Sequence, residues 1–229
     1  MSVDVIIPIH NGARFLQRSV GSALAQDIEG ITVWCVDDAS TDATPAVLAE
    51  LAATDPRVRV SRNESNVGVS ATRNRAVRLG TAPVVAFLDQ DDAWTDDKLA
   101  HQLAVFDARP EVDYVVGLQR LIVESGESAP SWCRPEWLLA PQAGYLPGCL
   151  AVRRESFLRI GFFDEAMRTG GDDTDWFARA RRQAAPHVAL DEVLLNRYLH
   201  DDNLSHDQST GNELLTAVRR HLRGGGSDH

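Results

Sequence analysis

The feature that most constrains this chain is the alternation of short apolar strands with amphipathic helices in about its first 90 residues. Apolar residues recur at helical spacing after each β-rich run, and turn residues such as Gly80 separate the segments. Strands that alternate with helices favour right-handed βαβ units and a parallel sheet. The pattern predicts strands at 3–9, 31–36, 58–60 and 83–88 and helices at 13–26, after Thr41 or Asp42, and at 69–79.

The second half of the chain is less regular. Its patterns predict a loop rich in Ser, Pro, Gly and Trp at 124–141, and we find no internal repeat or domain linker. We predict helices at 98–106, 173–182 and about 211–222, strands at 114–123 and 146–152, extended chain at 188–198, and a flexible tail at 223–229.

Composition excludes several classes of protein. The 229 residues are 44% hydrophobic, which suits a globular core, and the net charge of -10 argues against nonspecific nucleic-acid binding. No apolar run approaches the roughly 20 residues that span a bilayer, and the start of the chain lacks a basic signal region. Three widely spaced cysteines argue against disulfides and a zinc site, so we expect a cytoplasmic protein.

Acidic side chains gather where two predicted strands end. Asp37 and Asp38 follow the second strand, and Asp89-Gln90-Asp91-Asp92 follows the fourth. Ligands of open parallel sheets bind beyond the carboxyl ends of the strands. Carboxylates packed this closely need a cation, protons or donor groups, and Mn²⁺ or Mg²⁺ is the natural partner. Capping of the next helix by Asp91 and Asp92 is the alternative at this point.

Five ordered motifs give this pattern a family context. They are VIIPIHNGARFLQRSVGSALAQ, DDASTDAT, NVGVSATRNRAVRLG, VAFLDQDDAWTDDKL and GGDDTDWFARA, and together they resemble the family 2 glycosyltransferases with a GT-A fold. The resemblance implies an α/β protein with a Rossmann-like, mostly parallel central sheet, helices on both faces and a small antiparallel acceptor-side element. It implies one domain over 1–222, with a nucleotide-binding half at about 1–92 and an acceptor half at about 93–205.

The resemblance also implies which residues hold the nucleotide sugar. Asp38 would accept a hydrogen bond from the base edge. His10 stands where the family usually has Tyr, and because a His ring is also aromatic, it would still stack on the base. Arg73 would contact the diphosphate or hold the metal-binding aspartates in place. The expected nucleotide-sugar residues are Pro8, His10, Asn11, Asp38, Asn66, Gly68, Arg73, Asp89 and Gln90.

Metal and catalytic roles follow from the same likeness. Asp91 would ligate the metal, Asp89 would face the ribose or a metal-bound water, and His200 would reach the metal or the diphosphate. Asp173 matches the general base of an inverting single displacement. The expected acceptor-side residues are Asp172, which replaces the family's usual Glu, Trp176, Trp132 and Trp137.

We therefore expect a metal-dependent, non-processive glycosyltransferase that moves one sugar, from a UDP-sugar by preference, to a hydroxyl of a saccharide, lipid-linked or small-molecule acceptor. A non-catalytic nucleotide-sugar-binding module and a sugar nucleotidyltransferase are the alternatives. The basic stretches 179–182 and 219–223 suit peripheral contact with the inner face of a membrane, although solvated helix faces explain them as well. The short chain also leaves room for a homo-oligomer.

Overall fold

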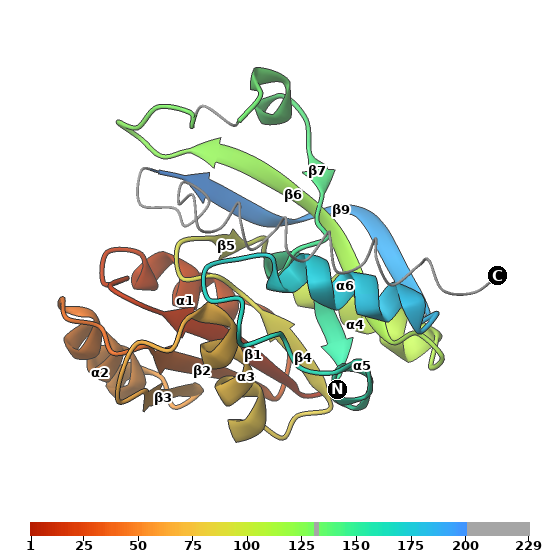
Figure 1. Ribbon diagram of the computed structural model, residues 1–229, viewed down its shortest axis with the longest axis horizontal. Coiled ribbons are helices and arrows are strands. Elements are labelled where there is room, and N and C mark those ends of the chain that lie inside the picture. Colours follow the sequence, from red (N-terminus) through yellow and green to blue (C-terminus); the bar gives the residue numbers. More distant parts are fainter. Residues whose placement is uncertain (131–132, 201–229) are drawn as a thin grey trace.

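The computed structural model describes residues 1–130 and 133–200. Within these residues, nine strands form one sheet in the order β3-β2-β1-β4-β8-β6-β9-β5, with β7 paired to β6 (Figure 1). The strands are β1 (Val3–Ile9), β2 (Ile31–Asp37), β3 (Val58–Arg62), β4 (Val84–Phe87), β5 (Ala93–Trp94), β6 (Tyr114–Val123), β7 (Gln142–Ala143), β8 (Ala151–Arg153) and β9 (His187–Leu199).

The first four strands are all parallel, as the alternating pattern predicts. β1 lies between β2 and β4, and β2 also pairs with β3. The helices α1 (Leu16–Leu24), α2 (Thr44–Thr54) and α3 (Val69–Leu79) connect these strands in chain order. The carboxyl ends of β1, β2 and β4 therefore open at one edge of the sheet, where parallel sheets bind ligands.

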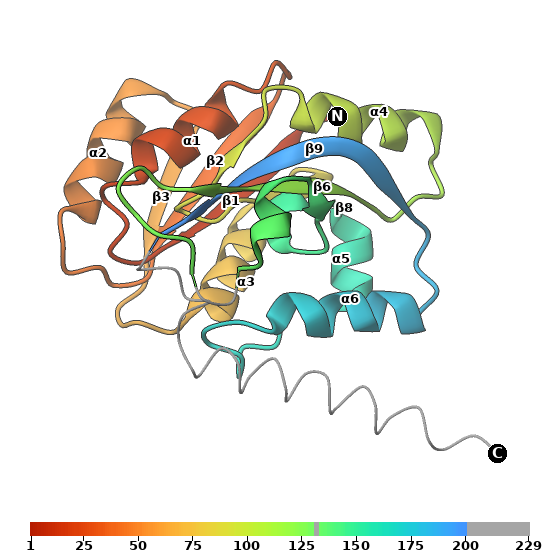
Figure 2. The same ribbon diagram turned by 90° about the horizontal axis from the view of Figure 1, so that it is seen from above.

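Helices cover both faces of the sheet. Figure 2 shows α1, α2 and α4 (Lys98–Ala108) on one face and α3, α5 (Arg154–Ile160) and α6 (Asp172–Arg182) on the other. Alternate residues of β1 enter two separate cores: Val5 packs on the first face and Ile6 on the second. Burial on both faces explains why this strand is a continuous apolar run. The predicted α/β architecture is confirmed.

The second half adds strands of mixed direction. β8 is antiparallel to both β4 and β6, whereas β9 runs parallel to β6 and antiparallel to β5. The prediction of a strand at 146–152 is wrong over its first half, because Pro147–Cys149 forms a 3-10 turn and only Ala151–Arg153 pairs. A second 3-10 turn, Pro135–Leu138, lies in the predicted loop.

Two helix starts also differ from expectation. α1 begins at Leu16 rather than 13, because Asn11 adopts a left-handed φ of 49° and the following residues form a turn. α2 begins at Thr44, whose backbone N–H donates to the Asp42 carboxylate at 2.9 Å.

Some expectations lie outside the described residues: Trp132, the helix at about 211–222 and the tail. In the part of the chain that the structure describes, no helix is both long and apolar enough to cross a membrane.

Candidate active site

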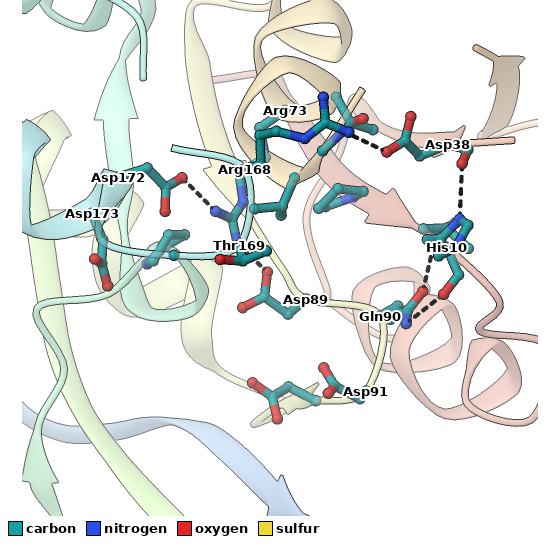
Figure 3. A pocket seen from close by; sticks show the side chains of 18 of the residues that line it. His10, Asp38, Arg73, Asp89, Gln90, Asp91, Arg168, Thr169, Asp172 and Asp173 are labelled. Atoms are coloured by element: carbon teal, nitrogen blue, oxygen red, sulfur yellow. Dashed lines mark hydrogen bonds and ion pairs between the residues drawn. The ribbon is translucent and has the colours of Figure 1, made fainter. Parts of the chain in front are cut away.

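A pocket of about 860 Å³ opens at the carboxyl ends of β1, β2 and β4. Figure 3 shows His10 and Asp38 at one end of it and Asp172 and Asp173 at the other, with Arg73 and Asp89 between them. The structure brings most of the predicted site residues to this pocket: Pro8, His10, Asn11, Asp38, Asn66, Gly68, Arg73, Asp89, Gln90, Asp91, Asp172, Asp173 and His200.

Asp38 is a buried carboxylate held by three donors. Its oxygens accept from the Asn63 side chain at 2.8 Å and from the backbone N–H groups of Val67 and Gly68 at 2.9 and 2.8 Å. A carboxylate offers about four acceptor positions, so room remains for one further N–H. Gly68 has a φ of 93°, and a Cβ there would lie 2.9 Å from the Cβ of Arg168. This turn therefore requires glycine.

The loop after β1 is tied to the acidic loop after β4. The His10 N–H donates to Gln90 Oε1 at 2.9 Å, and Gln90 Nε2 donates back to the His10 carbonyl at 3.1 Å. Gly12 leaves space for this Gln90 side chain, because a Cβ at position 12 would lie only 2.3 Å from the Gln90 oxygen. His10 Nδ1 in turn donates to the Asp38 carbonyl at 2.8 Å. The two loops thus form one unit on this side of the pocket.

Arg73 joins the two acidic motifs across the pocket. Its buried guanidinium donates to Asp89 at 2.5 Å and to Asp172 at 2.7 Å. Burial acts to lower the pKa of Arg73, but the charges of Asp89 and Asp172 outweigh it and raise that pKa above its ordinary value. Of the two roles expected for Arg73, the geometry is that of a residue that holds the aspartates in place.

Asp91 faces His200. His200 Nε2 lies 3.2 Å from Asp91 Oδ2, and the imidazole stacks on Phe15 with centroids 4.6 Å apart. Burial acts to raise the pKa of Asp91, but the hydrogen bond and charge of His200 bring it below its usual range. A carboxylate is the ligand type that Mg²⁺ and Mn²⁺ prefer, so Asp91 with His200 suits a divalent cation.

Asp92 is fully enclosed beside this pair. It accepts the Tyr198 N–H at 3.0 Å, and burial together with the charge of Asp91 raises its pKa well above the usual range. Within residues 1–130 and 133–200, no group of three or more His, Cys, Asp or Glu side chains is arranged to hold a metal. A cation at Asp91 and His200 would therefore need oxygens from a diphosphate and water to complete its shell.

Asp173 lies in the first turn of α6. Its carboxylate accepts the N–H of Thr174 at 2.6 Å. Burial, and then the negative charge of Asp172, raise the pKa of Asp173 to about 6. A carboxylate with this pKa is ionised at neutral pH yet basic enough to take a proton from a bound hydroxyl as that hydroxyl reacts.

Two predicted acceptor-side residues lie elsewhere. Trp176 is fully buried and stacks on Phe157 at 5.7 Å, because it faces the core side of α6. Trp137 does not line the pocket either; it packs with the small cluster formed by Leu121, Cys133 and Leu199. Trp176 is therefore a core residue. Trp137 is only half-buried, and its acceptor-side role stays a prediction.

Several pocket residues have no role in our sequence-based prediction. Arg168 and Thr169 come from the loop before α6, and Leu146 and Pro147 from the segment before β8. No motif marks these four residues, since a long return of the chain brings them to the pocket. Arg197 also lines the pocket. Its position three residues before His200 is the sequence feature from which this placement could have been predicted.

Comparison of the sequence with known proteins identifies the family of this chain. Residues 4–165 match the family model described as glycosyl transferase family 2. The succinoglycan biosynthesis protein ExoO of Rhizobium meliloti is 37% identical over 187 residues, which cover 74% of this chain and 53% of the relative. The first curated relatives are much longer, and this chain spans 36% of the length of each of two Rickettsia proteins.

Two solved structures share the fold. S. aureus TarS 1-349 in complex with UDP-GlcNAc has a TM-score of 0.75 and 22% identity over 96% of this chain and 65% of that one. The mannosyltransferase PcManGT of Pyrobaculum calidifontis, in complex with GDP-Man and Mn²⁺, has a TM-score of 0.77 and 21% identity over 96% and 64%. Because the family model covers most of the sequence and four of the five ordered motifs, the chain belongs to glycosyl transferase family 2.

Proposed function

We propose that the chain is a metal-dependent, inverting glycosyltransferase that moves one sugar from a nucleoside diphosphate to a hydroxyl acceptor. The observation that carries this proposal is the distribution of acids in one pocket. Asp38 has room for a base N–H at one end, Asp91 with His200 suits a divalent cation, and Asp173 has a pKa of about 6 at the other end. In the proposed transfer, these groups bind the base, hold the cation and accept the proton, respectively.

In the proposed reaction, Asp173 accepts the proton of the acceptor hydroxyl. The freed oxygen attacks the anomeric carbon and forms the new C–O bond, while the bond from that carbon to the diphosphate oxygen breaks with its electron pair. Attack opposite the leaving group inverts the anomeric configuration. Arg73 holds the carboxylate of Asp172, whose negative charge is one cause of the raised pKa of Asp173.

Asp91 and His200 are the proposed protein ligands of the cation, with Asp89 toward the ribose or a metal-bound water. A bound Mn²⁺ or Mg²⁺ supplies positive charge that stabilises the departing diphosphate. Asp89 keeps one carboxylate oxygen on Arg73, which leaves its second oxygen for this role.

A UDP-sugar is the proposed donor. Asp38 already accepts three hydrogen bonds, so one acceptor position remains, and a uracil ring presents a single N–H on that edge. A guanine edge presents more than one donor. TarS is bound to UDP-GlcNAc and PcManGT to GDP-Man, so the family fold accommodates both bases.

The acceptor side is proposed to take a saccharide or a lipid-linked saccharide. The relative ExoO carries the name of a polysaccharide biosynthesis protein, which supports this class.

A thermal-shift screen tests the proposal. UDP-, GDP- and dTDP-sugars are each added with and without Mn²⁺, and bound ligand raises the melting temperature through linkage. We expect the largest shift with a UDP-sugar and Mn²⁺ together. Asp91→Ala should abolish the metal-dependent part, and Asp173→Asn should keep binding but lose turnover. Strong donor binding with no turnover by the unmodified chain would favour a binding module instead.

A further inference from the structure

Arg18, on α1, contacts three separate segments around the metal-binding pair. Its guanidinium donates to the Asp91 backbone carbonyl at 2.6 Å and to both carboxylate oxygens of Glu124 at 2.7 and 3.2 Å. The same group lies 3.7 Å from the centroid of the Tyr198 ring. Arg18 itself does not line the pocket.

Each of these contacts leads to a residue of the proposed cation site. The Asp91 carbonyl belongs to the proposed metal ligand, and the Tyr198 N–H holds the carboxylate of Asp92. Glu124, at the end of β6, donates its backbone N–H to the Leu199 carbonyl, one residue before His200. Arg18 therefore touches both chain segments that carry Asp91 and His200.

These contacts need an arginine. A guanidinium is planar and carries five donors, so it can fork onto a carboxylate, reach a carbonyl and stack on a ring at once. A lysine would keep the charge, but its three donors share one nitrogen and cannot form a planar fork onto a carboxylate. The Arg18 side chain is about one quarter exposed, at 26%, so water screens its contacts only partly.

We propose that Arg18 is a positioning residue that sets the cation affinity of the Asp91–His200 pair by fixing the two segments that carry them. This inference rests on the proposed function, since it assigns a role to Arg18 in the same site. Loss of an outer partner of a metal ligand costs roughly 10- to 100-fold in metal affinity.

The sign of the effect distinguishes positioning from charge. Arg18 is a cation near the proposed cation site, so removal of its charge alone would strengthen Mn²⁺ binding. Removal of a positioning contact would weaken it. Arg18→Met, which keeps an extended side chain without charge, and Arg18→Lys, which keeps the charge without the fork, separate the two.

The experiment titrates the purified full chain with Mn²⁺ in the presence of a fixed concentration of UDP, which supplies the diphosphate oxygens, and measures free Mn²⁺ by electron paramagnetic resonance against a blank of UDP without protein. We expect both Arg18→Met and Arg18→Lys to bind Mn²⁺ roughly 10-fold or more weakly than the unmodified chain. Turnover of a donor should fall at low Mn²⁺ and recover toward the unmodified rate at saturating Mn²⁺.

Arg57 provides the matched control. It also forks onto a carboxylate, that of Asp55, and donates to a backbone carbonyl, that of Leu24, but it lies outside the pocket. Arg57→Lys should lower the melting temperature about as much as Arg18→Lys while leaving Mn²⁺ affinity unchanged.

Unchanged or tighter Mn²⁺ binding by Arg18→Met would overturn the inference, as would equal weakening by Arg57→Lys. A different result concerns the proposed function itself. If the unmodified chain binds no Mn²⁺ either alone or with a UDP-sugar, the cation site is wrong and the role of Arg18 falls with it.

Discussion

At the scale of single residues, the raised pKa of Asp173 predicts the pH dependence of transfer. As the proposed base, Asp173 must be ionised to accept a proton, and its pKa is about 6. We expect kcat/KM to be level above pH 7 and to fall about tenfold per pH unit well below pH 6. Above pH 7, Asp173→Asn should lose roughly 100- to 10,000-fold in kcat, and the difference should shrink at acidic pH, where Asp173 of the unmodified chain is itself protonated. A pH profile of donor turnover checks both expectations.

Asp172 allows a second test of the same carboxylate. Its negative charge, after burial, is the next cause of the raised pKa of Asp173. Asp172→Asn should therefore move the acidic limb of the pH profile to lower pH. An unmoved limb would mean that the profile reports another group, because a merely structural loss would reduce the rate without shifting its pH dependence.

Lys98, the only lysine of the chain, is fully buried near the start of α4. Its ammonium group donates to Gln102 at 2.7 Å, and burial lowers its pKa from 10.5 to about 7. The unfolded chain then binds more protons than the folded one between these two pH values, so this residue's penalty is complete below pH 7 and shrinks as the pH rises.

We therefore expect Lys98→Met to raise the free energy of unfolding at pH 7 by about 1–3 kcal/mol, and by less at pH 10. Lys98→Arg should destabilise at both, since arginine keeps its proton. Urea denaturation at pH 7 and pH 10 measures these differences. If Lys98→Met raised the free energy of unfolding equally at pH 7 and pH 10, the lowered pKa of Lys98 would be contradicted.

At the scale of elements, the sequence predicts some boundaries well and others poorly, for physical reasons. α3 and β6 begin and end as predicted, because a full apolar face and a β-rich run mark them clearly. α5 has 7 residues, too few for a periodic pattern, and was not predicted. The turn at Pro147 interrupts an apolar segment that reads as a strand, and only tertiary packing reveals it.

The same limit applies to the site. Asp38, Asp91 and Asp173 follow strands or begin a helix within recognisable motifs, so sequence alone suggests them. The partners of Arg18 lie 73 and 106 residues away along the chain. No local pattern predicts such contacts.

The turn before α3 can be tested as an element. Gly68→Ala would place a Cβ against Arg168 at a φ of 93°, so we expect a loss of about 1–3 kcal/mol in stability. Donor affinity should fall roughly tenfold or more, since the Gly68 N–H positions Asp38. Gly21→Ala in α1 is the control: nothing lies within 4 Å of its Cβ, and it should gain about 0.5–1 kcal/mol. Denaturant melts and donor titrations measure both variants.

At the scale of the whole molecule, the parallel strands place the proposed base and cation sites along one sheet edge, while the second half of the chain returns to supply His200 and Asp173. The formal net charge of -10 includes acids that converge on this pocket. Cation binding there would neutralise part of that charge, so the working enzyme would be less negative than its composition indicates.

The most direct test follows the anomeric configuration of the sugar that the chain releases. Proton nuclear magnetic resonance would record the first sugar formed when a UDP-sugar with an α-linked donor is incubated with Mn²⁺, with water as acceptor. Single displacement predicts that the β-anomer appears first and later mutarotates, and we expect Asp173→Asn to release neither anomer above background. Initial release of the α-anomer would contradict the proposed single displacement.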